Sequence, residues 1–76
     1  MENIDIVNAW LKISEADGID TILCSSSCNG KKRYYATINV GMLFHFSNTD
    51  ADVMKAIERT VNQYSNWVIE NESNKK

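Results

Sequence analysis

The 76-residue chain contains no hydrophobic run long enough to cross a membrane. A spanning helix needs about 20 consecutive apolar residues, and a signal peptide needs a positively charged start followed by an apolar segment. Neither pattern is present in the sequence. We therefore expect a cytoplasmic protein that makes no membrane contact.

An excess of positive charge is also missing. Ten acidic and eight basic residues give a formal net charge of −2. Non-specific binding of nucleic acid depends on a cationic surface, so the overall charge gives such binding no support. The chain is not acidic enough to act as a mimic of DNA either.

Side chains for catalysis and metal binding are few. Cys24 and Cys28 are the only cysteines, and His45 is the only histidine. A closed zinc site needs four ligands, and nucleophilic catalysis by cysteine needs a histidine beside it with a third group to orient it. On one strand the two cysteines would lie about 13 Å apart, too far for a disulfide. We therefore expect no enzymatic activity, no metal and no cofactor.

The length of the chain limits its architecture. Seventy-six residues allow a single small domain, 1–76. Hydrophobic residues make up 43% of the sequence, which is typical of a globular protein. A chain this short buries only about 60% of its unfolded surface, so its stability is marginal and dimerisation would be a natural supplement.

The stretch from Arg33 to Phe46 alternates between apolar and mixed side chains. Its even positions are all apolar or aromatic: Tyr34, Ala36, Ile38, Val40, Met42, Phe44 and Phe46. A period of two predicts β structure with one dry face and one wetter face. One strand of this length would be unusual, and residues 39–41 offer a place to turn. We predict two strands, at about 32–38 and 42–47, with one bent strand as the alternative.

Two amphipathic helices are predicted on either side of the strands. In residues 3–17, apolar side chains recur at helical spacing: Ile6, Val7, Trp10, Leu11 and Ile13. The second helix is predicted from about 50 to 70, with Ser47 or Thr49 as its cap. Its apolar residues recur at intervals of three and four: Val53, Ile57, Val61, Tyr64 and Val68. The polar tail, residues 71–76, is expected to fray.

Residues 19–28 form the first predicted strand and lead into a hairpin. Asn29-Gly30 is a strong turn signal because both residues tolerate positive φ. A two-residue turn places Leu23 opposite Ala36 on the dry face. A three-residue loop, 28–30, places Ile22 and Cys24 there instead. We favour the three-residue loop, because glycine then holds its left-handed position.

The predicted fold class is α+β, a two-layer sandwich with the element order α-β-β-β-α. The strands form an antiparallel meander, and both helices lie on one face of it. The expected core residues are Trp10, Leu11, Phe44, Phe46, Ile57 and Val61.

The uncovered face of the sheet and the hairpin tip are the candidate partner-binding surface. With both helices on the even face, no element of the chain covers four odd positions, Tyr35, Thr37, Leu43 and His45. The only basic run, Lys31, Lys32 and Arg33, lies at the hairpin tip and would steer association. Tyr35 is the expected anchor. The alternative is an ordinary solvated sheet face.

Negative charge gathers in the loop after the first predicted helix, at Glu15, Asp17 and Asp20. Such a cluster is typical of a solvated loop. The alternative is an acidic contact for a basic partner.

Two resemblances concern the order of elements. An α-β-β-β-α order in about 70 residues is similar to double-stranded-RNA-binding domains, whose second helix opens with a lysine-rich signature that grips phosphates. Here that position reads Asn48-Thr49-Asp50-Ala51-Asp52, which is acidic. The chain also resembles small phage-encoded inhibitors, including some anti-CRISPR proteins. That likeness lies in a short first helix, a polar hairpin, a strand rich in Val, Ile, Phe and Tyr, and an amphipathic closing helix.

The second resemblance implies a protein that covers a functional surface on a host enzyme. We therefore expect a non-enzymatic protein–protein interaction module, an inhibitor or regulator of a host protein. The expected partner is another protein, with a second copy of the chain as a further candidate. The alternative is a nucleic-acid-binding module of double-stranded-RNA-binding-like topology that uses the same hairpin tip.

Overall fold

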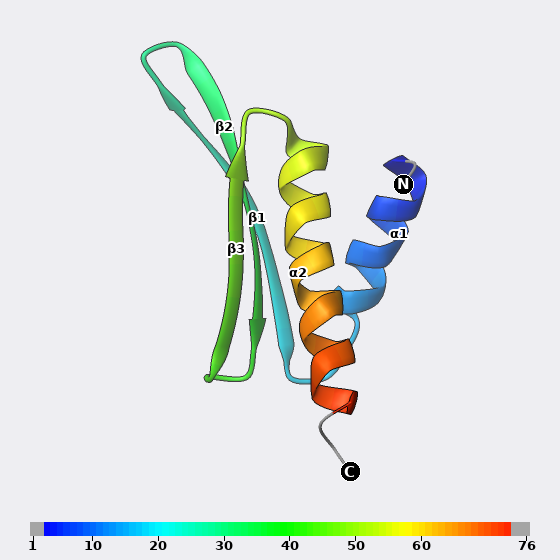
Figure 1. The fold of residues 1–76 in the computed structure, drawn as a ribbon. Coiled ribbons are helices and arrows are strands. Elements are labelled where there is room, and N and C mark those ends of the chain that lie inside the picture. The colour runs from blue at the N-terminus through cyan, green and yellow to red at the C-terminus, as the bar shows by residue number, and fades with distance from the viewer. Residues whose placement is uncertain (1–2, 74–76) are drawn as a thin grey trace.

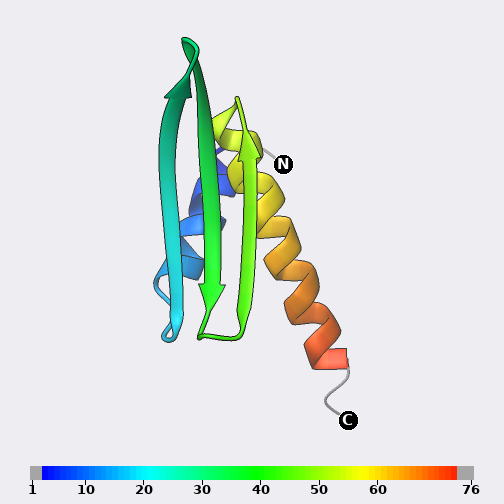
Figure 2. The same cartoon turned by 90° about the vertical axis from the view of Figure 1, so that its left-hand side faces the viewer.

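The computed structural model describes residues 3–73, which form two helices and one three-stranded sheet (Figure 1). The elements in chain order are α1 (Asn3–Ser14), β1 (Ile19–Cys28), β2 (Lys31–Val40), β3 (Phe44–Asp50) and α2 (Val53–Ser73). The strands are antiparallel in the spatial order β1-β2-β3. Figure 2, which faces the sheet, shows both helices behind it. The predicted α+β fold and its element order are confirmed.

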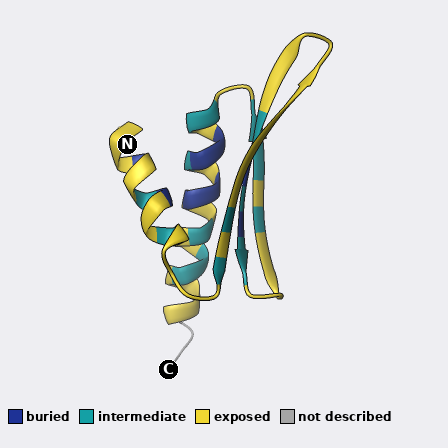
Figure 3. Cartoon of the chain, turned by 180° about the vertical axis from the view of Figure 1, so that it is seen from behind, coloured by how far each residue is buried: buried dark blue, intermediate teal, exposed yellow. Residues whose placement is uncertain are grey.

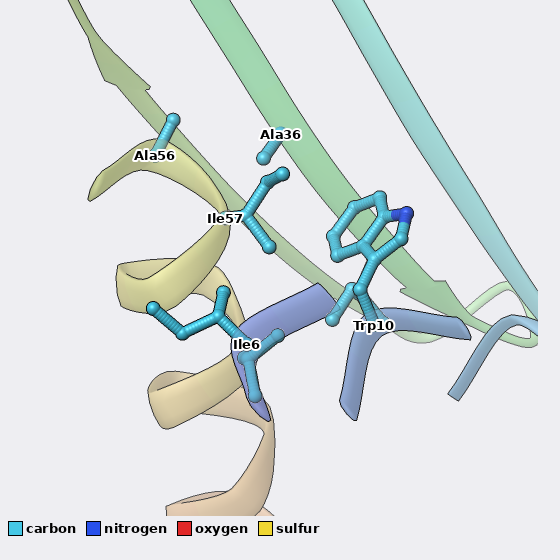
Figure 4. Close-up of a cluster of buried hydrophobic side chains, with 7 residues drawn as sticks. Ile6, Trp10, Ala36, Ala56 and Ile57 are labelled. Atoms are coloured by element: carbon cyan, nitrogen blue, oxygen red, sulfur yellow. The ribbon is translucent and has the colours of Figure 1, made fainter. Parts of the chain in front are cut away.

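The core lies between the helices and the sheet. Its buried hydrophobic residues are Ile6, Trp10, Ala36, Ile38, Ala56, Ile57 and Val61 (Figure 3). Ala36 and Ile38 belong to the even face of β2, which confirms the period-two reading of that strand. Figure 4 shows the Trp10 ring reaching from α1 toward the sheet, beside Ile57 of α2. One indole therefore joins both helices to the strands.

Two expected core residues lie outside the core. Leu11 is 52% exposed because it follows Trp10 by about 100° around α1 and points away from the sheet. Phe44 is 44% exposed because it begins β3, an edge strand, where its ring packs on Trp67 with centroids 4.8 Å apart. The apolar stripe of α1 is thus wider than the area that α2 and the sheet cover, and Leu11 lies on its uncovered side.

The stretch from Arg33 to Phe46 contains two strands, as predicted, and the single bent strand is wrong. Pairing between β2 and β3 ends at Val40 and Phe44, and the turn between them contains Gly41 with φ +61°. A left-handed conformation at this position favours glycine, because a Cβ atom would be strained there. Strand β2 extends beyond its predicted bounds at both ends, whereas β3 begins later than predicted, at Phe44, and continues to Asp50.

The favoured hairpin register is wrong, and the two-residue turn is the one observed. Asn29 and Gly30 have φ values of 55° and 75°, so both turn residues are left-handed, as in a type I′ turn. Leu23 therefore pairs with Ala36. Asparagine tolerates this conformation well enough that no third loop residue is needed. Ile22 and Cys24 consequently lie on the face away from the helices.

Helix α2 begins at Val53, later than predicted, and its cap is Asp52. The Asp52 carboxylate accepts a hydrogen bond from the Met54 backbone N–H at 2.9 Å, which satisfies one of the unpaired donors of the first turn. Ser47 and Thr49 belong to β3 instead. Residues 71–73 of the predicted tail continue α2, and residues 74–76 lie outside the described residues. Neither α1 nor α2 combines the length and apolar character that a membrane-spanning helix requires.

A fully buried threonine ties α2 to the sheet. The Thr60 hydroxyl lies 3.1 Å from the Ala36 carbonyl oxygen of β2 and 2.9 Å from the Ala56 carbonyl oxygen of its own helix. It also accepts a hydrogen bond from the Asn48 side-chain amide at 3.1 Å. The hydroxyl is thus satisfied as both donor and acceptor, which makes its burial tolerable.

Candidate interaction surface

The face of the sheet that points away from the helices, called the open face below, crosses all three strands. Cross-strand pairing arranges its side chains in three complete rows: Asp20, Asn39 and His45; Ile22, Thr37 and Ser47; Cys24, Tyr35 and Thr49. Most of these side chains are polar, with Ile22 and Tyr35 as the large apolar exceptions. Because α1 and α2 both lie on the other side of the sheet (Figure 2), neither covers the open face, which is available for contact with another molecule.

Hydrogen bonds between neighbouring strands fix several side chains of the open face. The Ser26 hydroxyl donates to the Tyr35 phenol oxygen at 3.2 Å, and the Thr37 and Ser47 hydroxyls lie 3.1 Å apart. His45 Nδ1 lies 2.6 Å from the Asn39 side-chain oxygen. Since an amide oxygen only accepts, this contact requires the proton on Nδ1. The surface is therefore ordered before any partner arrives, which lowers the entropy cost of binding.

The basic run lies at the tip of the β1–β2 hairpin, which projects past the helices (Figure 1). Lys31, Lys32 and Arg33 are all exposed. By the alternation of β2, Lys31 and Arg33 lie on the open-face side, whereas Lys32 lies on the opposite side. The tip thus presents positive charge on both sides of the hairpin, continuous with the open face on one of them.

The structure does not bring all the predicted partner-binding residues together. Tyr35, Thr37 and His45 share the open face, but Leu43 lies in the turn between β2 and β3 and is exposed at the other end of the sheet from the hairpin tip. The placement of Leu43 on the sheet face is wrong because alternation ends with the pairing of Val40 and Phe44. A ten-residue strand is about 33 Å long, so a contact at the tip does not reach Leu43.

Sequence reasoning missed a shallow pocket between β3 and α2. Its volume is about 490 Å³, and its lining residues are His45, Phe46, Gln63, Asn66, Trp67 and Glu70. Trp67 is the centre of an aromatic cluster, with ring centroids 5.8 Å from Phe46 and 6.1 Å from Tyr64. The sequence feature that could have indicated this pocket is the spacing of Gln63, Trp67 and Glu70, which places all three on one side of α2. The pocket offers amide and carboxylate groups beside an aromatic wall.

Two carboxylates, Asp50 at the end of β3 and Asp52 at the cap position, immediately precede α2. The Asp50 carboxylate accepts a hydrogen bond from the Asp52 backbone N–H at 2.9 Å and forms a salt bridge with Arg59 at 3.1 Å. Double-stranded-RNA-binding domains place phosphate-gripping lysines at the corresponding position, as the resemblance implied. Here Asp52 caps the helix and Asp50 engages Arg59, so these groups would repel a phosphate rather than bind it.

The same contacts lower the pKa of Asp50 below its ordinary value of 3.8. The hydrogen bond from the Asp52 backbone N–H is the main cause, and the positive charges of Arg59, Lys55 and Arg33 add to it, whereas partial desolvation acts in the opposite direction. A lowered pKa in the folded state means that ionised Asp50 stabilises the fold above its ordinary pKa. That contribution is lost as the pH falls through the lowered value.

We expect the Asp50→Asn variant to be less stable than wild type at neutral pH, with a deficit that shrinks as the pH falls below 3.8. Urea denaturation of both proteins across this range measures the difference. Asp17→Asn is the matched control, because Asp17 is an exposed carboxylate in the loop after α1. A deficit for Asp50→Asn that stays constant with pH would contradict the role given to its charge.

Within residues 3–73, no group of histidine, cysteine, aspartate and glutamate side chains is arranged to hold a metal ion. Cys24 and Cys28 are free and exposed on β1. The geometry defines a two-layer α+β protein with one uncovered sheet face and a cationic hairpin tip. No family model, curated protein or solved structure matches the chain.

Proposed function

We propose that this chain is a non-enzymatic protein–protein interaction module. The observation that supports the proposal best is the open face, an ordered and uncovered surface that crosses three strands and continues into the basic tip. Tyr35 lies on the central strand in the row nearest the basic tip, half-buried between Cys24 and Thr49, with its phenol oxygen bonded to Ser26. A large aromatic side chain held in one orientation is typical of the residues that dominate binding energy.

The basic tip gives the proposed partner a chemical character. Three exposed cations at the end of a projecting hairpin favour an acidic patch on the partner protein, because opposite potentials accelerate encounter. Thr37 and His45 then contribute polar contacts on the open face. Leu43 stays a candidate contact only for a partner large enough to extend from the hairpin tip to the turn between β2 and β3.

The finer proposal is an inhibitor or regulator of a host protein that acts in the cytoplasm. It is supported by the resemblance in element order to small phage-encoded inhibitors, and by an uncovered sheet face whose side chains are held by hydrogen bonds between strands. An inhibitor of this kind acts by covering a functional surface on its target. It therefore needs shape and charge rather than a reactive group.

The test is affinity capture with matched variants. The wild-type chain is expected to retain a stoichiometric protein partner from extracts of its host, and Tyr35→Ala is expected to weaken that partner about 30-fold or more, as for an interface hot spot. Lys12→Ala, on the exposed side of α1, is the control and should bind like wild type. Circular dichroism confirms that the variants are folded. Absence of a stoichiometric protein partner, or equal capture by Tyr35→Ala, would reject the proposal.

Nucleic-acid binding through the same tip is the second candidate. It is favoured by the three exposed cations beside Tyr35 and opposed by the carboxylates that immediately precede α2. It predicts a mobility shift at low salt that weakens steeply as salt is added and is lost in Arg33→Glu. A chain that shifts neither RNA nor DNA at low salt is not a nucleic-acid-binding module.

A further inference from the structure

The outer edge of β1 carries backbone groups that have no partner in the described chain. Cys28 and Lys31 flank a two-residue turn, so they exchange backbone hydrogen bonds. The Gly41 N–H donates to the Gly18 carbonyl at 2.9 Å at the other end of the ladder, which fits the same alternation. The odd residues of β1 therefore direct N–H and C=O away from β2. Those without a backbone partner in residues 3–73 are Thr21, Leu23, Ser25 and Ser27.

This edge lacks the features that usually prevent edge-to-edge pairing. Natural edge strands are short, bulged, or protected by charge or proline. Strand β1 has ten residues paired with β2 without a bulge, and residues 21–28 contain neither charge nor proline. Ile22 and Leu23 are 48% and 45% exposed on it. Figure 2 shows α1 behind the sheet rather than beyond this edge, so the edge is accessible.

We propose that β1 pairs antiparallel with β1 of a second copy, which forms a two-fold symmetric dimer with a continuous six-stranded sheet. Only one register gives a partner to all four residues of β1 that lack one in residues 3–73. In that register the two-fold axis of the dimer passes between the Cys24 residues of the two copies. Leu23 then bonds with Ser25 of the second copy, and Thr21 bonds with Ser27 of the second copy. With Leu23 on the axis, pairing would need Ile19, whose N–H already donates to Ala16. With Ser25 on the axis, Thr21 would lie opposite Asn29 of the second copy, which is in the hairpin turn and cannot continue the strand pairing.

Charge complementarity identifies a second copy as the occupant of this edge. An antiparallel arrangement brings the start of one β1 beside the end of the other. The start follows the acidic loop with Glu15 and Asp17, and the end leads into the basic tip with Lys31 and Lys32. In the proposed register Asp20 lies opposite Cys28 of the second copy, and Lys31 is paired with that Cys28 on the next strand, so Asp20 and Lys31 of the second copy share one row of the open face. By symmetry the attraction occurs at both ends of the interface.

The dimer also explains why the acidic loop and the basic tip lie at opposite ends of one strand. It would place the two open faces side by side on the same side of the joined sheet, because the two-fold axis is perpendicular to the sheet. The proposal goes beyond the proposed function and is independent of it, since a monomer can bind a partner protein through a single open face.

The first test is the mass of the reduced chain in solution, measured by analytical ultracentrifugation. Wild type is expected at about twice 8.6 kDa. Ser25→Pro removes an outward N–H without breaking the β1–β2 ladder, so we expect a folded monomer. Ser25→Ala is the matched control and should stay dimeric. A monomeric wild type, or a folded Ser25→Pro chain that still dimerises, would overturn the proposal; partner capture by a monomeric wild type would leave the proposed function intact.

A charge exchange keeps the proposal testable should Ser25→Pro fail to fold. Asp20→Lys and Lys31→Glu alone are each expected to raise the dissociation constant of the dimer several-fold at low salt, because each change removes two opposite-charge contacts by symmetry. The double variant should restore wild-type affinity, since the exchanged charges again attract. Absence of that restoration would contradict the proposed register.

Cross-linking through Cys24 tests the register directly. Residues facing each other across the axis would have Cα atoms about 4.5 Å apart, within the range for a disulfide. Diamide takes two electrons and two protons from the two Cys24 thiols, which forms the disulfide and a hydrazine. Cys28→Ser should give the covalent dimer, and Cys24→Ser should not. Cross-linking that requires Cys28 instead would reject the Cys24 axis.

Discussion

Replacing Trp10 with alanine is expected to lower the free energy of unfolding by about 3–5 kcal/mol. Trp10 is buried in the cluster that joins α1 to α2 and the sheet, so its removal leaves a large cavity where three elements meet (Figure 4). A domain of 76 residues has a total stability of about 4–11 kcal/mol. The Trp10→Ala chain should therefore be partly unfolded at room temperature, as measured by urea denaturation with circular dichroism.

Leu11→Ala is the matched control for this prediction. Leu11 is the next residue of the same helix and is also large and apolar, but it lies outside the buried cluster. Surface substitutions generally change stability by about 0.5 kcal/mol or less, so the midpoint of denaturation should shift little. A loss for Leu11→Ala as large as that for Trp10→Ala would mean that α1 is rotated relative to the structure described above.

Replacing Thr60 with valine is expected to cost about 1–3 kcal/mol, although the two side chains have nearly the same shape. Valine cannot accept from the Asn48 amide, and it cannot donate to the Ala36 carbonyl at the buried junction of α2 and β2. The cost comes from hydrogen bonds lost at a buried site, since no cavity is created. The shift of the urea midpoint, with an unchanged denaturant slope, measures it.

Thr21→Val is the matched control, because Thr21 is half-buried on the same side of the sheet and is not part of this network. A double-mutant cycle of Thr60→Val with Asn48→Ala isolates the pairwise contact. The two losses should overlap, so that the double variant loses less than the sum of the single variants. Strict additivity would show that the hydroxyl and the amide do not interact in solution.

Much of the fold follows from local patterns in the sequence. The alternation from Tyr34 to Phe46 indicates strands whichever partner they pair with, because it reflects a single buried face. The three- and four-residue spacing from Val53 to Val68 likewise indicates a helix. The glycine at position 41 marks the turn between two strands. These signals lie within short segments, so they can be read without knowledge of contacts between distant residues.

Other features depend on contacts between distant segments and were missed or wrong. The hairpin register depends on how the Asn29-Gly30 turn fits the twist of both strands, and two registers satisfy the local pattern equally well. The burial of Trp10 rather than Leu11 depends on the rotation of α1 against α2. Thr60 reads as an ordinary helix residue until the Ala36 carbonyl and the Asn48 amide are seen around it.

For the candidate interaction surface too, the sequence predicted some features correctly and the structure decided others. The sequence placed Tyr35, Thr37 and His45 on one face, and the structure agrees because β2 and β3 stay in phase across their pairing. It also placed Leu43 there, which fails because alternation does not continue through a turn. The meander predicted from the sequence already makes β1 an edge strand, and the structure adds that α1 lies behind the sheet and leaves that edge uncovered (Figure 2).

The amino-acid sequence by itself determined the kind and order of the elements, because side-chain periodicity and turn residues act over a few neighbouring positions. Only the tertiary structure decided which apolar residues of α1 are buried, which register joins β1 to β2, and which backbone groups of β1 stay without a partner in residues 3–73. Those choices are made by packing between segments far apart in the chain, where one geometry buries Trp10 and satisfies Thr60 together.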